Sequence, residues 1–208
     1  MLTISVSNIK GGSGKTTVAT SLAAWCAARG LRTGLADLDR QRGALSWLAR
    51  RSKDMPPIRG IDMTDGMEDA PRKLDVLVVD GVAAMRGKVT RDVVEESDCL
   101  LIPILPSILD EDGTRRFLDQ IAKLKPIRKG RRRVGFVANR LRPRTHAAVR
   151  LDAFLASQPY PTVARLRESS LYAAAAVSGL GIGEIAGRRA ASFREEWMPI
   201  LEFALPAE

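Results

Sequence analysis

Residues 10–17 read Lys10-Gly11-Gly12-Ser13-Gly14-Lys15-Thr16-Thr17, between the short apolar run 2–6 and an alanine-rich stretch. Three glycines allow a tight turn whose backbone N–H groups converge on one point, and a following helix adds the positive end of its dipole. The Gly-Lys-Thr ending is typical of loops that hold nucleotide phosphates. We expect Lys15 to reach the β- and γ-phosphates and the Thr16 hydroxyl to ligate Mg²⁺. The predicted phosphate loop consists of Gly11, Gly12, Ser13, Gly14, Lys15, Thr16 and Thr17.

The pattern of apolar runs predicts the fold class. Short apolar runs alternate with longer amphipathic or alanine-rich stretches, which is typical of βαβ units around a parallel sheet. Expected strands are 2–6, 33–36, 76–79, 99–104, 134–138 and 162–166. Expected helices are 16–29, 43–51, 88–96, 113–123, 145–156, 169–177 and 192–203, and expected loops are 55–57 and 126–130. The sequence predicts one α/β domain over residues 1–208, with a doubly wound, mostly parallel sheet and helices on both faces, as in P-loop NTPases.

The composition favours a polyanionic partner. The chain of 208 residues carries a formal net charge of +9 and has a pI of about 10.1. Twelve Lys or Arg and one acidic residue lie between Arg115 and Arg144, so the excess charge is local. Such a segment favours contact with nucleic acid or with an acidic membrane surface. Because neither a secretion signal nor an apolar run long enough to span a membrane is visible, we expect a soluble, cytoplasmic protein.

Neither the cysteines nor the histidine indicates a metal or redox site. Cys26 and Cys99 lie in apolar runs without CxxC spacing, and this predicts two buried thiols. His146, the only histidine, has no candidate partner nearby in the sequence. The sequence therefore indicates neither a cysteine- or histidine-ligated metal nor redox chemistry.

Lys10 distinguishes this loop from the general nucleotide-binding pattern. Ile9 stands where the first glycine of GxxxxGK[ST] would be, and the loop reads KGGxGK[ST] instead. Further motifs follow the predicted strands: Asp37-Leu38-Asp39-Arg40-Gln41, Asp80-Gly81, Leu105-Pro106-Ser107 and Asn139-Arg140. In these motifs, over nearly the whole chain, the sequence resembles the ParA/MinD family of P-loop ATPases, and most of all the small ParA-type partitioning ATPases. Arg40 departs from the pattern, because the family usually has a proline there.

The resemblance implies ATP and Mg²⁺ as ligands and a role for each matching residue. Lys10 is implied to reach across a nucleotide-sandwich dimer to the partner's phosphates. Asp39 is implied to orient the attacking water, since phosphoryl transfer depends on positioning and electrostatics. Asp37 is implied to support Mg²⁺ or its waters. Asp80 is implied to hold Mg²⁺ through water, because a carboxylate that ends a buried strand is costly unless it is paired or metal-linked.

Asn139 and Arg140 are the candidate adenine contacts. They end a predicted strand, at the edge where open α/β sheets bind ligands. A turn-forming asparagine followed by a surface arginine is the alternative. Two further alternatives stay open, a solvated loop lysine for Lys10 and a cap at a strand end for Asp37.

A second group of arginines is a candidate DNA-binding surface. Arg131, Arg132 and Arg133 precede a predicted strand, and so lie at the opposite end of the sheet from the phosphate loop. A loop of this kind suits sequence-independent contact with a phosphate backbone, and a solvated charged loop is the alternative. Arg165 and Arg167 are additional candidates by resemblance. The acidic residues and Pro199 in the tail argue against a membrane-binding helix.

These features predict an ATPase that switches between monomer and dimer. ATP is expected to close a homodimer that holds DNA non-specifically on the nucleoid, and a ParB-like or adaptor protein to stimulate hydrolysis and release. The function expected from the resemblance is partition of plasmid or chromosome DNA. The alternatives are positioning of a protein cargo on the nucleoid, a small-molecule P-loop kinase or ligase, and a structural dimer that binds ATP without hydrolysing it. A kinase would give no reason for Lys10.

Overall fold

The computed structural model describes residues 1–67, 73–83 and 87–205. The sheet of seven parallel strands has the order β3-β2-β4-β1-β5-β6-β7. The strands are β1 (Leu2–Val6), β2 (Thr33–Asp37), β3 (Ile58–Asp62), β4 (Val76–Asp80), β5 (Cys99–Ile104), β6 (Arg133–Leu141) and β7 (Thr162–Arg167). The phosphate loop follows β1, so it starts from the middle of the sheet. The predicted doubly wound α/β class is confirmed.

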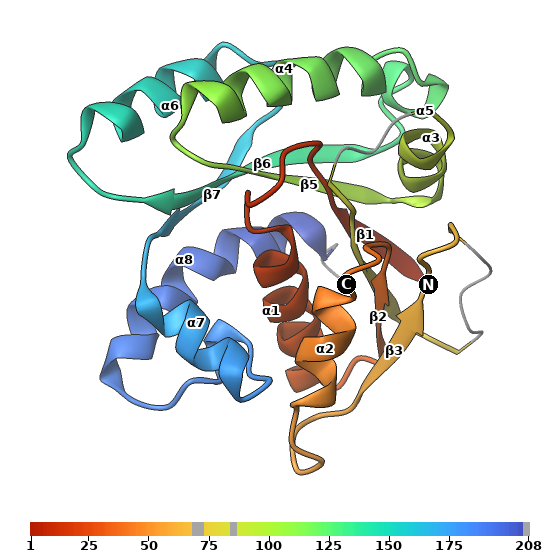
Figure 1. The fold of residues 1–208 in the computed structure, drawn as a ribbon, viewed down its shortest axis with the longest axis vertical. Coiled ribbons are helices and arrows are strands. Elements are labelled where there is room, and N and C mark those ends of the chain that lie inside the picture. Colours follow the sequence, from red (N-terminus) through yellow and green to blue (C-terminus); the bar gives the residue numbers. More distant parts are fainter. Residues whose placement is uncertain (68–72, 84–86, 206–208) are drawn as a thin grey trace.

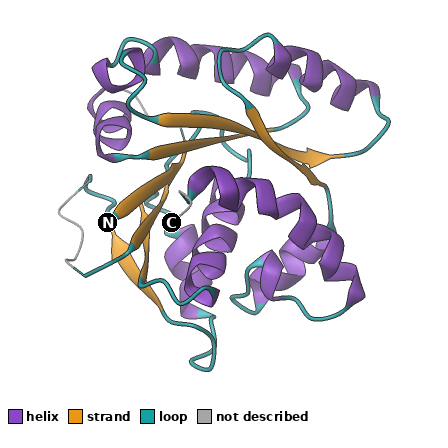
Figure 2. Ribbon diagram, turned by 180° about the vertical axis from the view of Figure 1, so that it is seen from behind, coloured by secondary structure: helices purple, strands orange, loops and turns teal. Residues whose placement is uncertain are grey.

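Helices cover both faces of the sheet (Figures 1 and 2). One face carries α3 (Gly87–Glu96), α4 (Ile108–Ile121), α5 (Lys125–Arg128) and α6 (His146–Ala156). The other carries α1 (Lys15–Ala28), α2 (Gly43–Ala49), α7 (Ser170–Val177) and α8 (Arg188–Ala204), and the short 3-10 helix η1 (Ile182–Glu184) contacts α1 and α8. Two apolar cores result, one on each face, because the central strands bury side chains on both sides.

Local sequence explains where the first helix begins and ends. Gly14 precedes α1 with a φ of 92°, a left-handed conformation that favours glycine. Gly30 ends the helix at φ 81°, where its N–H donates to the Ala27 carbonyl at 2.9 Å and the Leu31 N–H donates to the Cys26 carbonyl at 3.2 Å. These bonds satisfy carbonyls that the helix end would otherwise leave unpaired. The predicted helix 16–29 therefore agrees with α1 to within one residue at each end.

Four elements differ from the prediction. The edge strand β3 was not expected, since most of its side chains are not buried and no apolar run marks it. The expected loop 126–130 contains α5, with a proline in its first turn. Helix α4 begins at Ile108, five residues before the expected start, and includes Gly113. Helix α8 starts four residues earlier than expected and continues through Pro199.

Candidate functional site

Two buried asparagines fix the phosphate loop between β1 and α1. The Asn8 side-chain amide donates to the Pro103 carbonyl and to the Thr114 hydroxyl, both at 3.0 Å. The Asn139 amide donates to the Ser13 carbonyl at 2.8 Å. A Cβ on Gly14 would lie 2.2 Å from the Asn139 amide nitrogen. Glycine is therefore needed here for two reasons: the backbone is left-handed, and the Asn139 side chain packs where a Cβ would be. The loop is therefore held at both ends before any ligand binds.

Lys15 lies inside the loop. Its side-chain ammonium donates to the Lys10 carbonyl at 2.8 Å, and the residue is 7% exposed. Burial lowers the pKa of the Lys15 ammonium, and the negative charges of Asp80, Asp39 and Asp110 oppose that shift. The ammonium is thus a partly desolvated cation at the start of α1, where a lysine of this kind of loop binds phosphate oxygens.

Asp80 and Thr16 form the best metal site among the described residues. Asp80 is 1% exposed, and its Oδ1 atom accepts no hydrogen bond. Burial raises the pKa of Asp80 to about 7, the Thr16 hydroxyl acts in the opposite direction, and the charge of Asp37 raises it further. Burial of the Asp80 carboxylate is unfavourable, and a bound cation would stabilise its ionised form. The unpaired oxygen and the nearby hydroxyl therefore fit Mg²⁺.

The described residues contain no group of three or more His, Cys, Asp or Glu side chains that could hold a metal ion. Mg²⁺ keeps several waters and is held by one or two protein groups together with substrate phosphates, so it needs no larger cluster. Thr16 and Asp80 would hold it beside the phosphates, where its charge would offset theirs.

Asp37 has a structural role. Its Oδ2 accepts the N–H groups of Ala44 at 2.8 Å and Leu45 at 3.1 Å, and its Oδ1 accepts the Asp39 N–H at 3.0 Å. These bonds cap the first turn of α2 with a fully buried carboxylate. The strand-end cap that the sequence left open is thus present, and support of Mg²⁺ by Asp37 stays a prediction.

Asp39 lies in the loop between β2 and α2. Its carboxylate accepts the Gln41 N–H at 3.0 Å, and its charge acts on the Lys15 ammonium. The side chain is only partly buried, so it is open to water. Its assignment as the group that orients the attacking water remains a prediction. Arg40 is exposed, and none of its contacts with the described residues explains why it replaces the usual proline.

Lys10 extends along α4. A Cβ on Gly113 would lie 2.4 Å from Lys10 Cγ and 2.6 Å from Lys10 Cδ, so the stem of the lysine rests on the surface of that helix. Burial raises the pKa of Asp110, and the nearby Lys10 charge opposes this shift most strongly. The two lysines of the loop thus differ in their contacts, because the Lys15 ammonium donates within the loop and the Lys10 stem contacts Gly113 of α4.

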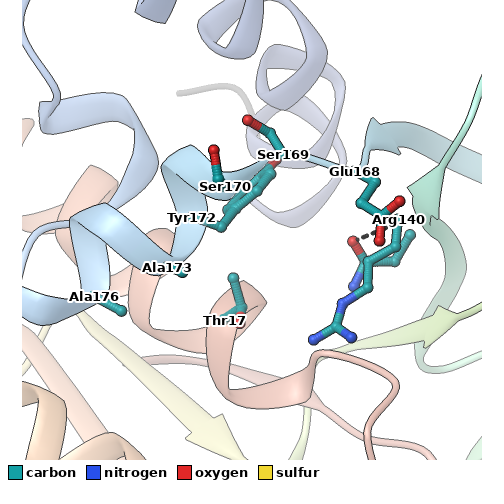
Figure 3. A pocket seen from close by; sticks show the side chains of 9 residues that line it. Thr17, Arg140, Glu168, Ser169, Ser170, Tyr172, Ala173 and Ala176 are labelled. Atoms are coloured by element: carbon teal, nitrogen blue, oxygen red, sulfur yellow. Dashed lines mark hydrogen bonds between the residues drawn. The ribbon is translucent and has the colours of Figure 1, made fainter.

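A cavity of about 440 Å³ opens beside Thr17 at the end of the sheet (Figure 3). Its size is that of a small-molecule site. Asn139 and Arg140 contribute to it, but the Asn139 amide is engaged with the phosphate loop. Sequence reasoning missed the β7–α7 segment on the other side, which carries no motif. The lining residues are Thr17, Asn139, Arg140, Glu168, Ser169, Ser170, Tyr172, Ala173 and Ala176.

Four of the five candidate DNA-binding arginines have partners within the protein. Arg132 donates to the Val94 and Glu95 carbonyls near the end of α3, and Arg133 donates to the Phe203 and Ala204 carbonyls at the end of α8. Arg165 pairs with Asp152, and Arg167 pairs with Glu196. Arg131 is exposed, and its backbone N–H donates to the Pro126 carbonyl at 2.9 Å, but its side chain has no ion pair with any described residue. DNA contact by the five arginines stays a prediction, and it is simplest for Arg131.

The C-terminal helix packs on the protein, as its sequence predicted. Trp197, Ile200, Leu201 and Ala204 are fully buried in the core beneath α1. In the part of the chain that the structure describes, no helix combines the length and the apolar character that crossing a bilayer needs. The apolar face of α8 is therefore occupied by the fold itself.

A glycine loop from a central parallel strand, a buried lysine at its end and a threonine beside a buried strand-end carboxylate define a P-loop nucleotide-binding protein. Residues 4–182 match the model of the CobQ/CobB/MinD/ParA nucleotide binding domain, and the chain belongs to this family. It is thus a ParA/MinD-type ATPase, and solved members of similar fold hold ATP or Mg-ADP.

Individual relatives agree with the family match. The "Maintenance of carboxysome distribution protein A" of Halothiobacillus neapolitanus is 29% identical over 212 residues, which span 99% of this chain and 97% of the relative. The fold resembles that of McdA from Cyanothece in complex with ATP, with a TM-score of 0.74, 16% identity and coverage of 96% of both chains. A putative plasmid partition protein from Borrelia burgdorferi bound to AMPPNP gives a TM-score of 0.74 at 14% identity, over 96% of this chain and 98% of that one.

Proposed function

We propose that the protein is an ATP-dependent dimerisation switch that binds DNA non-specifically and positions a cargo. The observation that carries this proposal is the pair of lysines in one loop. Lys15 is buried over the loop, whereas Lys10 extends away from it along α4. The position of Lys10 outside the phosphate site of its own chain is explained if its side chain contacts the nucleotide of another subunit.

The cargo we propose is a protein assembly, and partition of DNA is the second candidate. The relative from Halothiobacillus neapolitanus, similar along the whole chain, is named for carboxysome distribution, and this favours a protein cargo. The plasmid partition protein of similar fold supports the second candidate by fold alone. In either case an adaptor or ParB-like protein that stimulates hydrolysis would connect the switch to its cargo, and the dimer would be held on the nucleoid.

Replacing Asp39 with Ala should reduce ATP turnover by about 100-fold, because only a positioned carboxylate near the γ-phosphate orients the attacking water. ATP binding should change little, since Asp39 contributes no predicted phosphate contact. Release of inorganic phosphate and binding of a fluorescent ATP analogue measure the two effects separately. Turnover retained in the variant would refute the assignment of Asp39. Turnover by the native protein that requires a small-molecule acceptor would favour a kinase instead.

The DNA proposal predicts that Arg131→Ala weakens binding to random-sequence duplex by a few-fold and makes the salt dependence less steep, since each phosphate contact releases counterions. An electrophoretic shift assay with ATP across a salt series measures both. Lys53→Ala, which also removes one positive charge from an exposed position, is the matched control and should leave binding unchanged. Unchanged binding by the Arg131 variant and by a variant with Ala at Arg131, Arg132 and Arg133 would remove this segment from the DNA contact.

A further inference from the structure

Helix α2 is bonded at its start to the loop that carries Asp39. The Asp37 carboxylate accepts two N–H groups of the first turn of α2, at 2.8 and 3.1 Å, and it also accepts the Asp39 N–H at 3.0 Å. A Cβ on Gly43, the first residue of the helix, would lie 3.4 Å from the Thr16 methyl group, so α2 also packs on a residue of the predicted metal site. A displacement of α2 would therefore reach both Asp39 and Thr16.

The other end of α2 is bonded to the segment that follows α7. The Trp47 indole N–H donates to the Leu180 carbonyl at 3.2 Å, and the Arg51 guanidinium donates to the Gly179 carbonyl at 3.1 Å. Gly179 has a φ of 63°, and a Cβ there would lie 2.4 Å from the Arg51 backbone nitrogen, so the two backbones are in direct contact. A shift of this end of α2 would therefore move the segment after α7 as well.

A third bond connects α2 to the wall of the cavity beside Thr17. The exposed side chain of Arg50 donates through Nε to the Ala176 carbonyl at 3.1 Å. Ala176 lines the cavity together with Tyr172 and Ala173, and Figure 3 shows these residues on α7, across from Thr17. The cavity is the predicted base site, so a base seated there would contact the helix to which Arg50 is bonded.

We infer that α2 couples this cavity to Asp39, with Trp47 and Arg50 as positioning residues for ATP hydrolysis. A rigid helix that is bonded at both ends carries a displacement from one site to the other. A base in the cavity fixes α7, the bonds to α7 and the segment after it fix α2, and the start of α2 holds the Asp39 carboxylate in place for the attacking water. The inference rests on the proposed role of Asp39, and it makes the base of the nucleotide, besides its phosphates, a determinant of the rate.

A double variant with Trp47→Phe and Arg50→Met removes both side-chain bonds and keeps an aromatic ring and an apolar stem. Its ATP turnover at saturation, measured as release of inorganic phosphate, should fall by about 10-fold, because a misplaced catalytic group slows the reaction. Binding of a fluorescent ATP analogue should stay within about threefold of the native value, since the described lining of the cavity includes neither side chain. Arg50→Lys alone should keep native turnover, because an ammonium can donate to the same carbonyl.

Inorganic tripolyphosphate separates this coupling from a purely structural role. With Mg²⁺ it can occupy the phosphate loop, but it has no base to enter the cavity beside Thr17. The native protein should hydrolyse ATP at saturation about 10-fold faster than tripolyphosphate, whereas the double variant should hydrolyse both at similar rates, because the base no longer acts on Asp39. A purely structural role would lower both rates equally and leave their ratio unchanged, and that result would overturn the inference.

Arg194→Met is the matched control. The exposed Arg194 side chain also donates to backbone carbonyls after α7, those of Gly183 and Ile185 at 3.2 and 3.1 Å, but it belongs to α8 and not to α2. Its replacement should leave both rates unchanged, and a loss equal to that of the double variant would overturn the inference. Native-like ATP turnover by the double variant would overturn it as well. Turnover retained by Asp39→Ala would instead refute the role of Asp39 on which the inference rests.

Discussion

Replacing Lys15 with Met is expected to weaken ATP binding by about 100-fold or more, the scale of removing one partner of a buried charge pair. The ammonium is buried in the loop at the start of α1, where it donates to the Lys10 carbonyl. Methionine keeps the apolar stem of the side chain and removes the charge. The loss of ATP affinity therefore measures the contact between the ammonium and the phosphates. Equilibrium titration with a fluorescent ATP analogue measures it.

Thermal unfolding without nucleotide is the control for this variant. Burial lowers the pKa of the Lys15 ammonium, so the folded protein carries a desolvation cost that methionine does not have. The Lys15→Met protein should therefore unfold at the native temperature or above it. ATP affinity within about threefold of the native value would contradict the assignment of this loop as the phosphate site.

Replacing Arg51 with Ala should lower the free energy of unfolding by about 3–5 kcal/mol, as breaking a buried ion pair does. Arg51 forms two bonds with the Glu184 carboxylate, at 2.7 and 2.6 Å, and one with the Gly179 carbonyl at 3.1 Å. The side chains of Arg51 and Glu184 are 4% and 8% exposed. The loss would leave the Glu184 charge buried and unpaired. Equilibrium unfolding in urea measures it.

The Arg32–Asp75 pair provides the matched control. Its side chains are 64% and 34% exposed, so Arg32→Ala should cost no more than about 1 kcal/mol. Replacing Arg51 with Met and Glu184 with Leu together should cost less than Arg51→Ala alone, because no buried charge is left. Equal losses for Arg51→Ala and Arg32→Ala would show that the buried pair does not hold the end of α2 to the segment before α8.

Most of the sheet and the phosphate loop could be predicted from the sequence because their signals are local. The strands β4 and β5 are almost wholly apolar, β1 alternates apolar and small polar residues, and the glycines of the loop are next in sequence to Lys15. Strand β3 could not be found in this way, since it lies at the edge of the sheet and carries mostly exposed or half-buried side chains. Edge strands need little apolar surface, so their sequences resemble loops.

The parts of the site that could not be predicted depend on contacts between residues far apart in the sequence. Asn139 and Ser13 are 126 positions apart, and their hydrogen bond is visible only when β6 lies two strands from β1. Residues of the segment 168–176 line the cavity without any motif, since a wall of serine and alanine side chains beside Glu168 and Tyr172 has no required sequence. Arg132 and Arg133 were predicted to contact DNA, with a solvated loop as the alternative, and their bonds to carbonyls at the ends of α3 and α8 could not be predicted from a local charge run.

The most direct test of the account compares native protein with Lys10→Ala by light scattering, with and without Mg²⁺ and AMPPNP. Native protein should be monomeric without nucleotide and dimeric with it. The Lys10→Ala protein should bind the nucleotide through Lys15 and stay monomeric, since it lacks the cation proposed to reach the partner's phosphates. A Lys10→Ala protein that dimerises with nucleotide as the native protein does would contradict the account.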